Sequence, residues 1–388
     1  MSDAPTATAS ERDSHLFAAG PKRILALDGG GVRGIVALAF LKRIERTLEA
    51  EAGRFVRLCD HFDLIGGTST GAIIAVALAL GHNVDQIRDF YMRLAPRVFR
   101  PPWLRLPGWK AIFDARALAS ELQGVIGDRR LDTLDLKCGV GVMLKRIDTA
   151  SAWILTNNPR SAFWETPPDH SFIGNRNYLL AQIVRASTAA PHYFDPQEIE
   201  IVAGEPPGLF VDGGLTPHNN PSLALFLSAC VPGYGLAWEA KPEKLTIVSI
   251  GAGTFRDRIA SRALSKGPSA KLALRAMIQQ IGDNQQLILM LMSLLGESPT
   301  PWPINSEIGD LGAAPAPRGP LFRFLRYDMK LEAQWFSAKL GETLTEKQIA
   351  QMRRLDDTGS MPLLEALATK AAQVQVRRED WSAPAAAT

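Results

Sequence analysis

A serine between two glycines is the first feature of the sequence that could carry out chemistry. The segment Gly67-Thr68-Ser69-Thr70-Gly71 fits the pattern G-x-S-x-G, and it lies between a short apolar run and the apolar segment 72–80. Between a strand and a helix, the two glycines allow a sharp turn that projects the serine hydroxyl as a nucleophile. The alternative interpretation is that Ser69 only caps the following helix.

A serine hydroxyl needs a base within hydrogen-bonding distance to become a nucleophile. Asp212 is the favoured candidate, because it ends the apolar run 209–211 and precedes Gly213 and Gly214. Asp-Gly pairs also begin ordinary turns, which is the competing interpretation. A histidine would complete the more common triad. The histidines after Ser69 lie in no motif typical of a base: His82, His170, His192 and His218.

A second glycine-rich turn indicates a site for negative charge. The segment Asp28-Gly29-Gly30-Gly31-Val32-Arg33-Gly34 separates a predicted strand from a predicted helix. Glycines at such a junction let successive backbone N–H groups point to one spot beside the helix N-terminus. The run also fits the dinucleotide pattern G-x-G-x-x-G, but the acidic residue expected to close a second strand is missing. A tight turn that needs glycines only for packing is the third interpretation.

The elements that would position these residues alternate as in an α/β fold. Segments 23–27 and 62–65 are short and apolar, and each precedes a glycine turn and a helical segment, at 35–48 and 72–80. Two such units predict a parallel sheet covered by helices, with both turns at one edge. Further strands are predicted at 139–147, 152–155, 198–202, 209–211, 244–250 and 322–328, and helices at 270–295 and 362–374.

Four segments, in this order, resemble the patatin-like phospholipase family. They are ILALDGGGVRGI (24–35), GGTSTGAIIA (66–75), RASTAAPHYF (185–194) and DGGLTPHNNPS (212–222). The resemblance implies an α/β fold: a three-layer α/β/α sandwich with a mostly parallel central sheet and a largely helical C-terminal part. The chain would then divide into a flexible tail (1–20), a patatin-like catalytic domain (21–255) and a mainly helical region packed on that domain (256–388).

The resemblance also implies a role for each residue of the two glycine turns and the aspartate. Ser69 would be the nucleophile and Asp212 its general base, without a histidine. The nucleophile elbow would include Gly67 and Gly71, and the DGG motif Gly213 and Gly214. The oxyanion hole would consist of the amides of the glycine turn, held by an arginine: Gly30, Gly31, Val32 and Arg33.

The implied function is a calcium-independent lipid acyl hydrolase that cleaves fatty-acyl esters through an acyl-serine intermediate. No cofactor and no metal are expected. An esterase or thioesterase acting on soluble acyl groups is an alternative, as is a phospholipase effector of anti-phage defence that a cyclic nucleotide activates. A lipid- or nucleotide-binding regulator with a vestigial site is the alternative outside the enzymes.

One basic, aromatic segment predicts contact with lipid. Residues 93–110 contain five basic and no acidic residues, interleaved with aromatic and leucine side chains. Aromatic rings favour the headgroup layer, and basic side chains are attracted to anionic lipid. The candidate contacts are Arg100, Trp103, Arg105, Trp109 and Lys110. The alternative is a proline-rich connector whose tryptophans pack on the body of the protein.

Composition narrows the remaining classes of protein. The 388 residues are 46% hydrophobic and carry a net charge of only +3, which excludes a disordered chain and argues against a nucleic-acid binder. The three cysteines share no short spacing, which indicates a reducing compartment. The first twenty residues lack the apolar run of a secretory signal. We therefore expect a cytoplasmic protein that binds no nucleic acid. The family resemblance implies a phospholipid or other acyl-lipid substrate and peripheral contact with membranes, and it allows a small-molecule activator.

Overall fold

The computed structural model describes residues 10–99, 111–256, 269–305, 308–311 and 319–381. Within them, nine strands form a single mixed sheet with the order β5-β6-β3-β2-β1-β7-β9-β8, and β4 pairs with the other edge of β3. The neighbours are parallel from β3 to β8, and antiparallel where β4, β5 and β6 pair. The strands are β1 (Lys22–Leu27), β2 (Leu64–Thr68), β3 (Gly139–Arg146), β4 (Ser151–Thr156), β5 (Gln197–Ile199), β6 (Gly208–Asp212), β7 (Leu245–Ile250), β8 (Glu297–Thr300) and β9 (Arg323–Tyr327).

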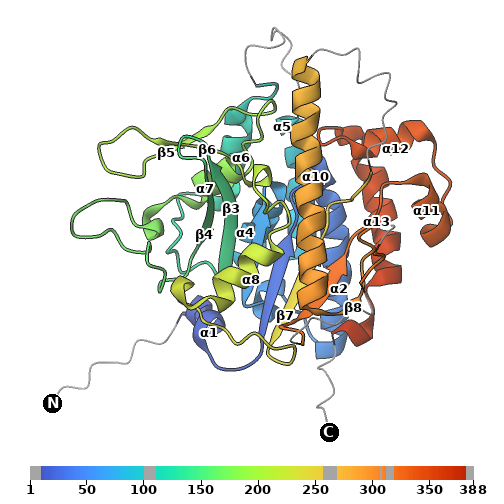
Figure 1. Cartoon of the computed structure of the whole chain (residues 1–388), viewed down its shortest axis with the longest axis horizontal. Helices are drawn as coiled ribbons and strands as arrows, with labels where there is room; N and C mark the ends of the chain where they lie inside the picture. Colours follow the sequence, from blue (N-terminus) through green and yellow to red (C-terminus); the bar gives the residue numbers. More distant parts are fainter. Residues whose placement is uncertain (1–9, 100–110, 257–268, 306–307, 312–318, 382–388) are drawn as a thin grey trace.

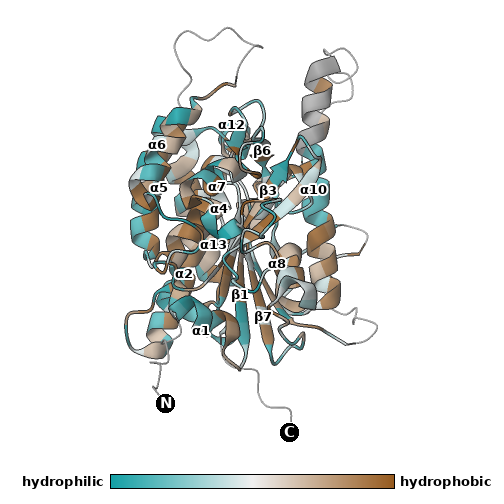
Figure 2. Ribbon diagram, turned by 90° about the vertical axis from the view of Figure 1, so that its left-hand side faces the viewer, coloured by the Kyte–Doolittle hydropathy of each residue, from teal (hydrophilic) through white to brown (hydrophobic). Residues whose placement is uncertain are grey.

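Helices cover both faces of this sheet (Figures 1 and 2). In β1, Leu25 and Leu27 join one apolar core, whereas Ile24 and Ala26 join the other, because successive side chains of a strand point to opposite faces. The first core is covered by α2 (Gly34–Ala52), α3 (Leu58–His61), α4 (Thr70–Ala79), α5 (Val84–Val98), α6 (Ala115–Ile126), α7 (Leu180–Ser187), α11 (Ala333–Leu340), α12 (Glu346–Arg353) and α13 (Met361–Gln375). The second is covered by α1 (Glu11–Phe17), α8 (Ser222–Cys230) and α10 (Ser269–Leu295). The predicted three-layer sandwich is confirmed.

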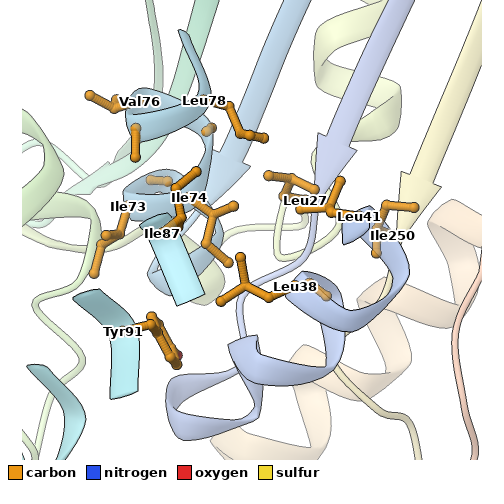
Figure 3. Packing of buried hydrophobic residues seen from close by; sticks show 14 of the residues in the cluster. Leu27, Leu38, Leu41, Ile73, Ile74, Val76, Leu78, Ile87, Tyr91 and Ile250 are labelled. Carbon is orange, nitrogen blue, oxygen red and sulfur yellow. The ribbon is translucent and has the colours of Figure 1, made fainter. Parts of the chain in front are cut away.

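Helix α4 lies in the middle of the larger core. All ten of its residues are buried, which explains why segment 72–80 is apolar on every side rather than amphipathic. Figure 3 shows its Ile73 and Ile74 packed near Ile87 and Tyr91 of α5 and near Leu38 of α2. The helix that follows the candidate nucleophile is therefore held firmly in place.

The structure corrects two expectations about how the chain is divided. The predicted loose tail is wrong for Glu11–Phe17, which form α1 with Ser10 as N-cap. Leu16 of this helix is only 1% exposed, and its carbonyl accepts a hydrogen bond of 2.9 Å from the indole of Trp238. The sheet also continues across the predicted boundary at residue 255, because β9 pairs with β7.

The register of β3 brings the two catalytic candidates together. On one edge of β3, Met143 faces Thr68, the last residue of β2. The next residue, Leu144, faces Asp212, the last residue of β6. Since β4 occupies the opposite edge of β3 over the same residues, β6 continues the position that β2 leaves. Asp212 therefore lies directly beyond the turn that carries Ser69.

Candidate active site

Ser69 sits on a strained turn between β2 and α4. Its φ of 55° and ψ of −127° are unfavourable for a residue with a side chain, and such strain costs about 1–3 kcal/mol. A Cβ atom on Gly67 would lie 2.2 Å from the carbonyl of Gly71, and one on Gly71 would lie 2.4 Å from the Leu27 oxygen. Both glycines are thus required by close backbone contacts, as a nucleophile elbow needs.

A second serine holds this turn. The Ser69 N–H donates a hydrogen bond of 2.9 Å to Ser187 Oγ, and the Ser187 hydroxyl donates one of 2.7 Å to the carbonyl of Met143. Ser187 ends α7 and is completely buried. It lies in the RASTAAP segment, but sequence reasoning assigned it no role, because nothing in the sequence indicates that its hydroxyl bridges two strands.

Asp212 is buried beside Ser69. Its carboxylate accepts a hydrogen bond of 2.7 Å from the Gly214 N–H and also interacts with the Ser69 side chain. Burial raises the pKa of Asp212 to about 6, although the bonds to Ser69 and Gly214 and the charge of Arg185 oppose the rise. A Cβ atom on Gly213 would lie 2.3 Å from the Met143 oxygen, so the DGG motif also satisfies a close backbone approach.

The glycine turn after β1 lies at the same edge of the sheet. Gly31 has a φ of +56°, and a Cβ atom on it would lie 2.3 Å from the Leu355 oxygen. The Gly30 N–H donates to Thr70 Oγ1 at 3.2 Å, and the Val32 N–H donates to the Leu355 carbonyl at 2.9 Å. Among the described residues, the Gly31 N–H has no acceptor. The Gly30 and Val32 amides, both predicted as oxyanion donors, are therefore hydrogen-bonded to other groups in this structure.

Arg33 fastens the glycine turn to the segment that follows β7. Its Nη1 donates to the Gly253 carbonyl at 3.0 Å and its Nε to the Gly30 carbonyl at 3.4 Å. The guanidinium also lies 5.3 Å from the centre of the Phe255 ring. Burial lowers the pKa of Arg33 to about 10, so the side chain keeps its charge at neutral pH.

A buried ionic network supports the turn from below. Arg326 of β9 binds both carboxylate oxygens of Asp28, at 3.1 and 2.7 Å, and the Asp328 carboxylate at 2.8 Å. Gln285 of α10 donates to Asp28 at 3.0 Å and accepts from Asn219 at 3.1 Å. The sequence predicts a strand at 322–328, which holds Arg326, but it does not identify the carboxylates that Arg326 contacts.

Ser69, Asp212 and the glycine turn all line a single cavity of about 1110 Å³. One part of its wall is apolar and comes from α4, α5, α6 and the segment after α7: Ile73, Leu94, Val98, Phe99, Leu118 and Phe194. Another part carries charge and comes from the ends of β7, β9 and α12: Arg256, Lys330, Glu332, Arg353, Arg354 and Asp356. The cavity can thus take a molecule with one apolar and one polar end.

The histidines do not approach the serine. His192 lines the cavity, whereas His82, His170 and His218 do not. The Nδ1 atom of His218 is buried and has no hydrogen-bond partner in the described part of the chain. No histidine in residues 10–99 and 111–256, which contain all six, forms a hydrogen bond with Ser69 or Asp212. This geometry favours a serine–aspartate pair.

Three further observations concern membrane contact and metal binding. The candidate membrane contacts Arg100, Trp103, Arg105, Trp109 and Lys110 lie outside the described residues. Among the residues that are described, no helix is both long and apolar enough to cross a bilayer. The same residues contain no group of three or more histidine, cysteine, aspartate or glutamate side chains arranged to hold a metal ion.

Comparison with known proteins places this geometry in a family. Residues 25–226 match the family model described as patatin-like phospholipase. The cUMP-AMP-activated phospholipase of Escherichia coli is 32% identical over 60% of this chain and 65% of its own length. The cGAMP-activated phospholipase of Vibrio cholerae is 31% identical over 52% and 55%. The rat calcium-independent phospholipase A2-gamma is 30% identical over 70% and 33%.

The alignments therefore span between a third and two thirds of these relatives' own lengths. Among solved structures, human GIVD cytosolic phospholipase A2 matches 95% of this chain and 61% of its own, with a TM-score of 0.46 and 11% identity. The family model covers more than half of this chain, including both glycine turns and Asp212. The chain belongs to the patatin-like phospholipase family.

Proposed function

We propose that this protein is a lipid acyl hydrolase that cleaves fatty-acyl esters of phospholipids through Ser69 and Asp212. The observation that carries the proposal is the meeting of Ser69, buried Asp212 and the glycine turn at one wall of a partly apolar cavity. Three features of a serine hydrolase, a nucleophile, a base and amide donors, thus line one cavity. Three relatives are named as phospholipases, which supports the same activity.

The proposed reaction begins when Ser69 Oγ attacks the ester carbonyl carbon while Asp212 takes the hydroxyl proton. The carbonyl oxygen becomes an oxyanion, for which we assign the Gly31 amide as donor, joined by the Gly30 amide when that N–H leaves Thr70 Oγ1. Each donor of this kind can contribute about 3 kcal/mol to the transition state. Collapse expels the lyso-lipid alkoxide, which takes the proton from Asp212 and leaves an acyl-serine. Water, deprotonated by Asp212, then releases the fatty acid and restores Ser69.

The protein environment compensates for a weak base. An ordinary aspartate has a pKa of about 3.9 and is far from matching a serine hydroxyl. Burial raises the pKa of Asp212 to about 6, which makes its carboxylate a stronger base while leaving it ionised at neutral pH. The positive end of α4 adds stabilisation where negative charge develops on the bound ester.

Contact with a membrane surface is the second part of the proposal. Ile147 follows the end of β3, Leu209 lies in the first half of β6, the strand that ends at Asp212, and the two are 51% and 37% exposed. The Ile147 N–H donates to the Leu209 carbonyl at 2.8 Å, so the two residues lie side by side. Apolar side chains at the edge that carries the active site can enter the headgroup layer as a lipid approaches.

The test is fatty-acid release from phospholipid vesicles with EDTA present, for wild type, Ser69→Ala and Asp212→Asn. We expect calcium-independent release that falls more than about a thousandfold in both variants. Asp212→Asn should remain folded, because the amide keeps the acceptor for the Gly214 N–H and loses the cost of a buried charge. Release retained by Asp212→Asn would refute the dyad, and a preference for soluble esters would indicate an esterase.

The same vesicles test membrane contact by co-sedimentation. Ile147→Ser with Leu209→Ser should lower the bound fraction, whereas unchanged sedimentation would exclude this surface.

Activation by a small molecule is the other alternative that the relatives favour, since two of them are named for cyclic-nucleotide activation. Adding cUMP-AMP or cGAMP to the release assay tests it, and an increase in rate is the expected sign of activation.

A further inference from the structure

The charged part of the cavity wall contains hydrogen-bond donors that lack acceptors. Thr254 Oγ1 is buried and has no hydrogen-bond partner within the described residues. The Lys330 ammonium lies 5.7 Å from the Trp302 ring and donates no hydrogen bond to any described residue. Arg353 uses Nε for the Leu331 carbonyl, at 2.9 Å, which leaves both Nη groups without a described acceptor. A buried hydroxyl without a partner, such as that of Thr254, requires an explanation, and the two cations are free to bind a ligand.

These donors are attached to one short piece of backbone. Thr254 and Lys330 form an isolated parallel bridge, in which the Leu331 N–H donates to the Thr254 carbonyl at 2.7 Å. Arg353 Nε donates to the carbonyl of Leu331, the residue that follows Lys330. Its guanidinium lies 5.1 Å from the centre of the Phe255 ring, which the Arg33 guanidinium also approaches. All three residues line the catalytic cavity, next to one another in the fold.

The charges around this space favour an anion. Burial lowers the pKa of Lys330, while the carboxylate of Glu332 opposes that shift. Glu332 accepts a hydrogen bond of 3.2 Å from the Arg256 N–H, and Arg354 is paired with Asp356 at 3.1 Å. Apart from the Arg354–Asp356 pair, the cavity wall carries four cations, Arg33, Arg256, Lys330 and Arg353, against three carboxylates, Asp212, Asp283 and Glu332. The local excess is positive.

The distance from Ser69 suits a group on the same ligand. Along the sheet, Ser69 follows β2, the glycine turn follows β1, and Thr254 follows β7. Neighbouring strands lie about 4.8 Å apart, so β2 and β7, which precede Ser69 and Thr254, are separated by roughly 10 Å. Arginine and lysine side chains span much of such a gap. A phosphate a few bonds from the ester carbonyl can thus reach them.

We propose that Thr254, Lys330 and Arg353 form a subsite for a phosphodiester anion on the wall of the catalytic cavity. A singly charged phosphodiester accepts several hydrogen bonds and pairs well with a guanidinium fork. As the headgroup of a lipid it would orient the ester toward Ser69, and in this form the subsite rests on the proposed function. A soluble phosphodiester, such as a cyclic dinucleotide, has the same chemistry. None of the three residues lies in the part of the chain that matches the family model.

The experiment compares two lipids with the same acyl chains in mixed detergent micelles. Phosphatidylglycerol carries the phosphodiester, and diacylglycerol lacks it. For Lys330→Met, Arg353→Met and Thr254→Val, we expect kcat/KM for phosphatidylglycerol to fall about tenfold or more beyond any fall for diacylglycerol. Lys347→Met is the control, because Lys347 is exposed on α12, the helix that also carries Arg353. It should leave kcat/KM for both lipids unchanged.

Calorimetric titration of Ser69→Ala with cGAMP and with glycerophosphoglycerol distinguishes the two sources. Binding of glycerophosphoglycerol that Lys330→Met abolishes supports a headgroup site, and the same result with cGAMP supports a soluble ligand. Equal falls on both lipids together with unchanged titrations would overturn the subsite. If wild type hydrolyses neither lipid, the proposed function fails, and the titrations still decide whether the anion subsite exists.

Discussion

At the residue scale, the environment of Asp212 sets the chemistry of the site. The side chain is buried, and its charge is held by an amide, a hydroxyl and the nearby Arg185 rather than by a direct ion pair. Burial outweighs these interactions and keeps the pKa of the carboxylate above its ordinary value. The site therefore combines a charge that persists at neutral pH with a useful affinity for a proton.

The pH dependence of the reaction follows from this pKa. The proposed base acts only when it is deprotonated, and burial raises the pKa of Asp212 to about 6. We therefore expect kcat/KM to be constant above that value and to fall about tenfold for each pH unit below it. The measurement is a pH profile of kcat/KM on a neutral soluble ester, which avoids titration of the lipid. A fall in kcat/KM that begins only near pH 4 would show that the pKa of Asp212 is not raised. A profile with no fall at low pH would show that Asp212 is not the base.

At the element scale, the sequence predicts strands and glycine turns better than helices. The runs at 23–27, 139–147 and 244–250 are found within about two residues, because buried parallel strands are short, apolar and bounded by turns. Helices α1, α3, α5 to α8, α11 and α12 and strand β8 were not predicted. Strand β8 (Glu297–Thr300) has no apolar pattern, and its half-exposed position at the end of the sheet explains why.

The candidate site was predictable to the extent that it is local. Ser69, Asp212 and the glycine turn each stand out because glycines bound them in the chain. Ser187 and Arg326 do not, since their roles depend on which elements become neighbours. Ser187 meets Ser69 only because α7 ends over β3, and Arg326 meets Asp28 only because β9 joins the sheet two strands from β1.

Ser187 provides a prediction at this scale. Ser187→Ala would leave the N–H of the strained Ser69 and the Met143 carbonyl without their partner, and we expect kcat to fall about tenfold with little change in KM. Ser228→Ala is the matched control, since Ser228 is also buried but only donates to the Ala224 carbonyl within its own helix. Steady-state kinetics on a soluble ester, with thermal unfolding of each variant, provide the comparison. Equal kinetics for the two variants would show that Ser187 does not position the nucleophile.

At the scale of the whole molecule, the C-terminal third completes the catalytic unit. The family model ends at residue 226, yet Asp28 of the glycine turn is neutralised by Arg326 of β9, a hundred residues later in the chain. The same arginine donates to Ser249 of β7 at 2.8 Å. Through Gln285, which lines the cavity, the network also reaches α10, the long helix of Figure 1. Strands and helix outside the matched region thus fix the loop that we assign to the oxyanion.

This dependence predicts that Arg326 is essential for stability. Its removal would leave the carboxylates of Asp28 and Asp328 facing each other without a buried cation, and losing one side of a buried ion pair typically costs about 3–5 kcal/mol. Even with Arg326 present, burial raises the pKa of Asp28 to about 6, so without it Asp28 should bind a proton at neutral pH. We expect Arg326→Met to lower the free energy of unfolding in urea by that amount.

Two further variants separate charge from packing in that experiment. Arg378→Met removes a guanidinium from an exposed pair with Glu51, and we expect it to change the free energy of unfolding by less than about 1 kcal/mol. Adding Asp28→Asn and Asp328→Asn to Arg326→Met removes the uncompensated charges, so most of the lost stability should return while the activity stays low. If the triple variant were as unstable as Arg326→Met, the arginine would act through packing alone. If it regained full activity, the ionic network would not be what holds the glycine turn in its catalytic shape.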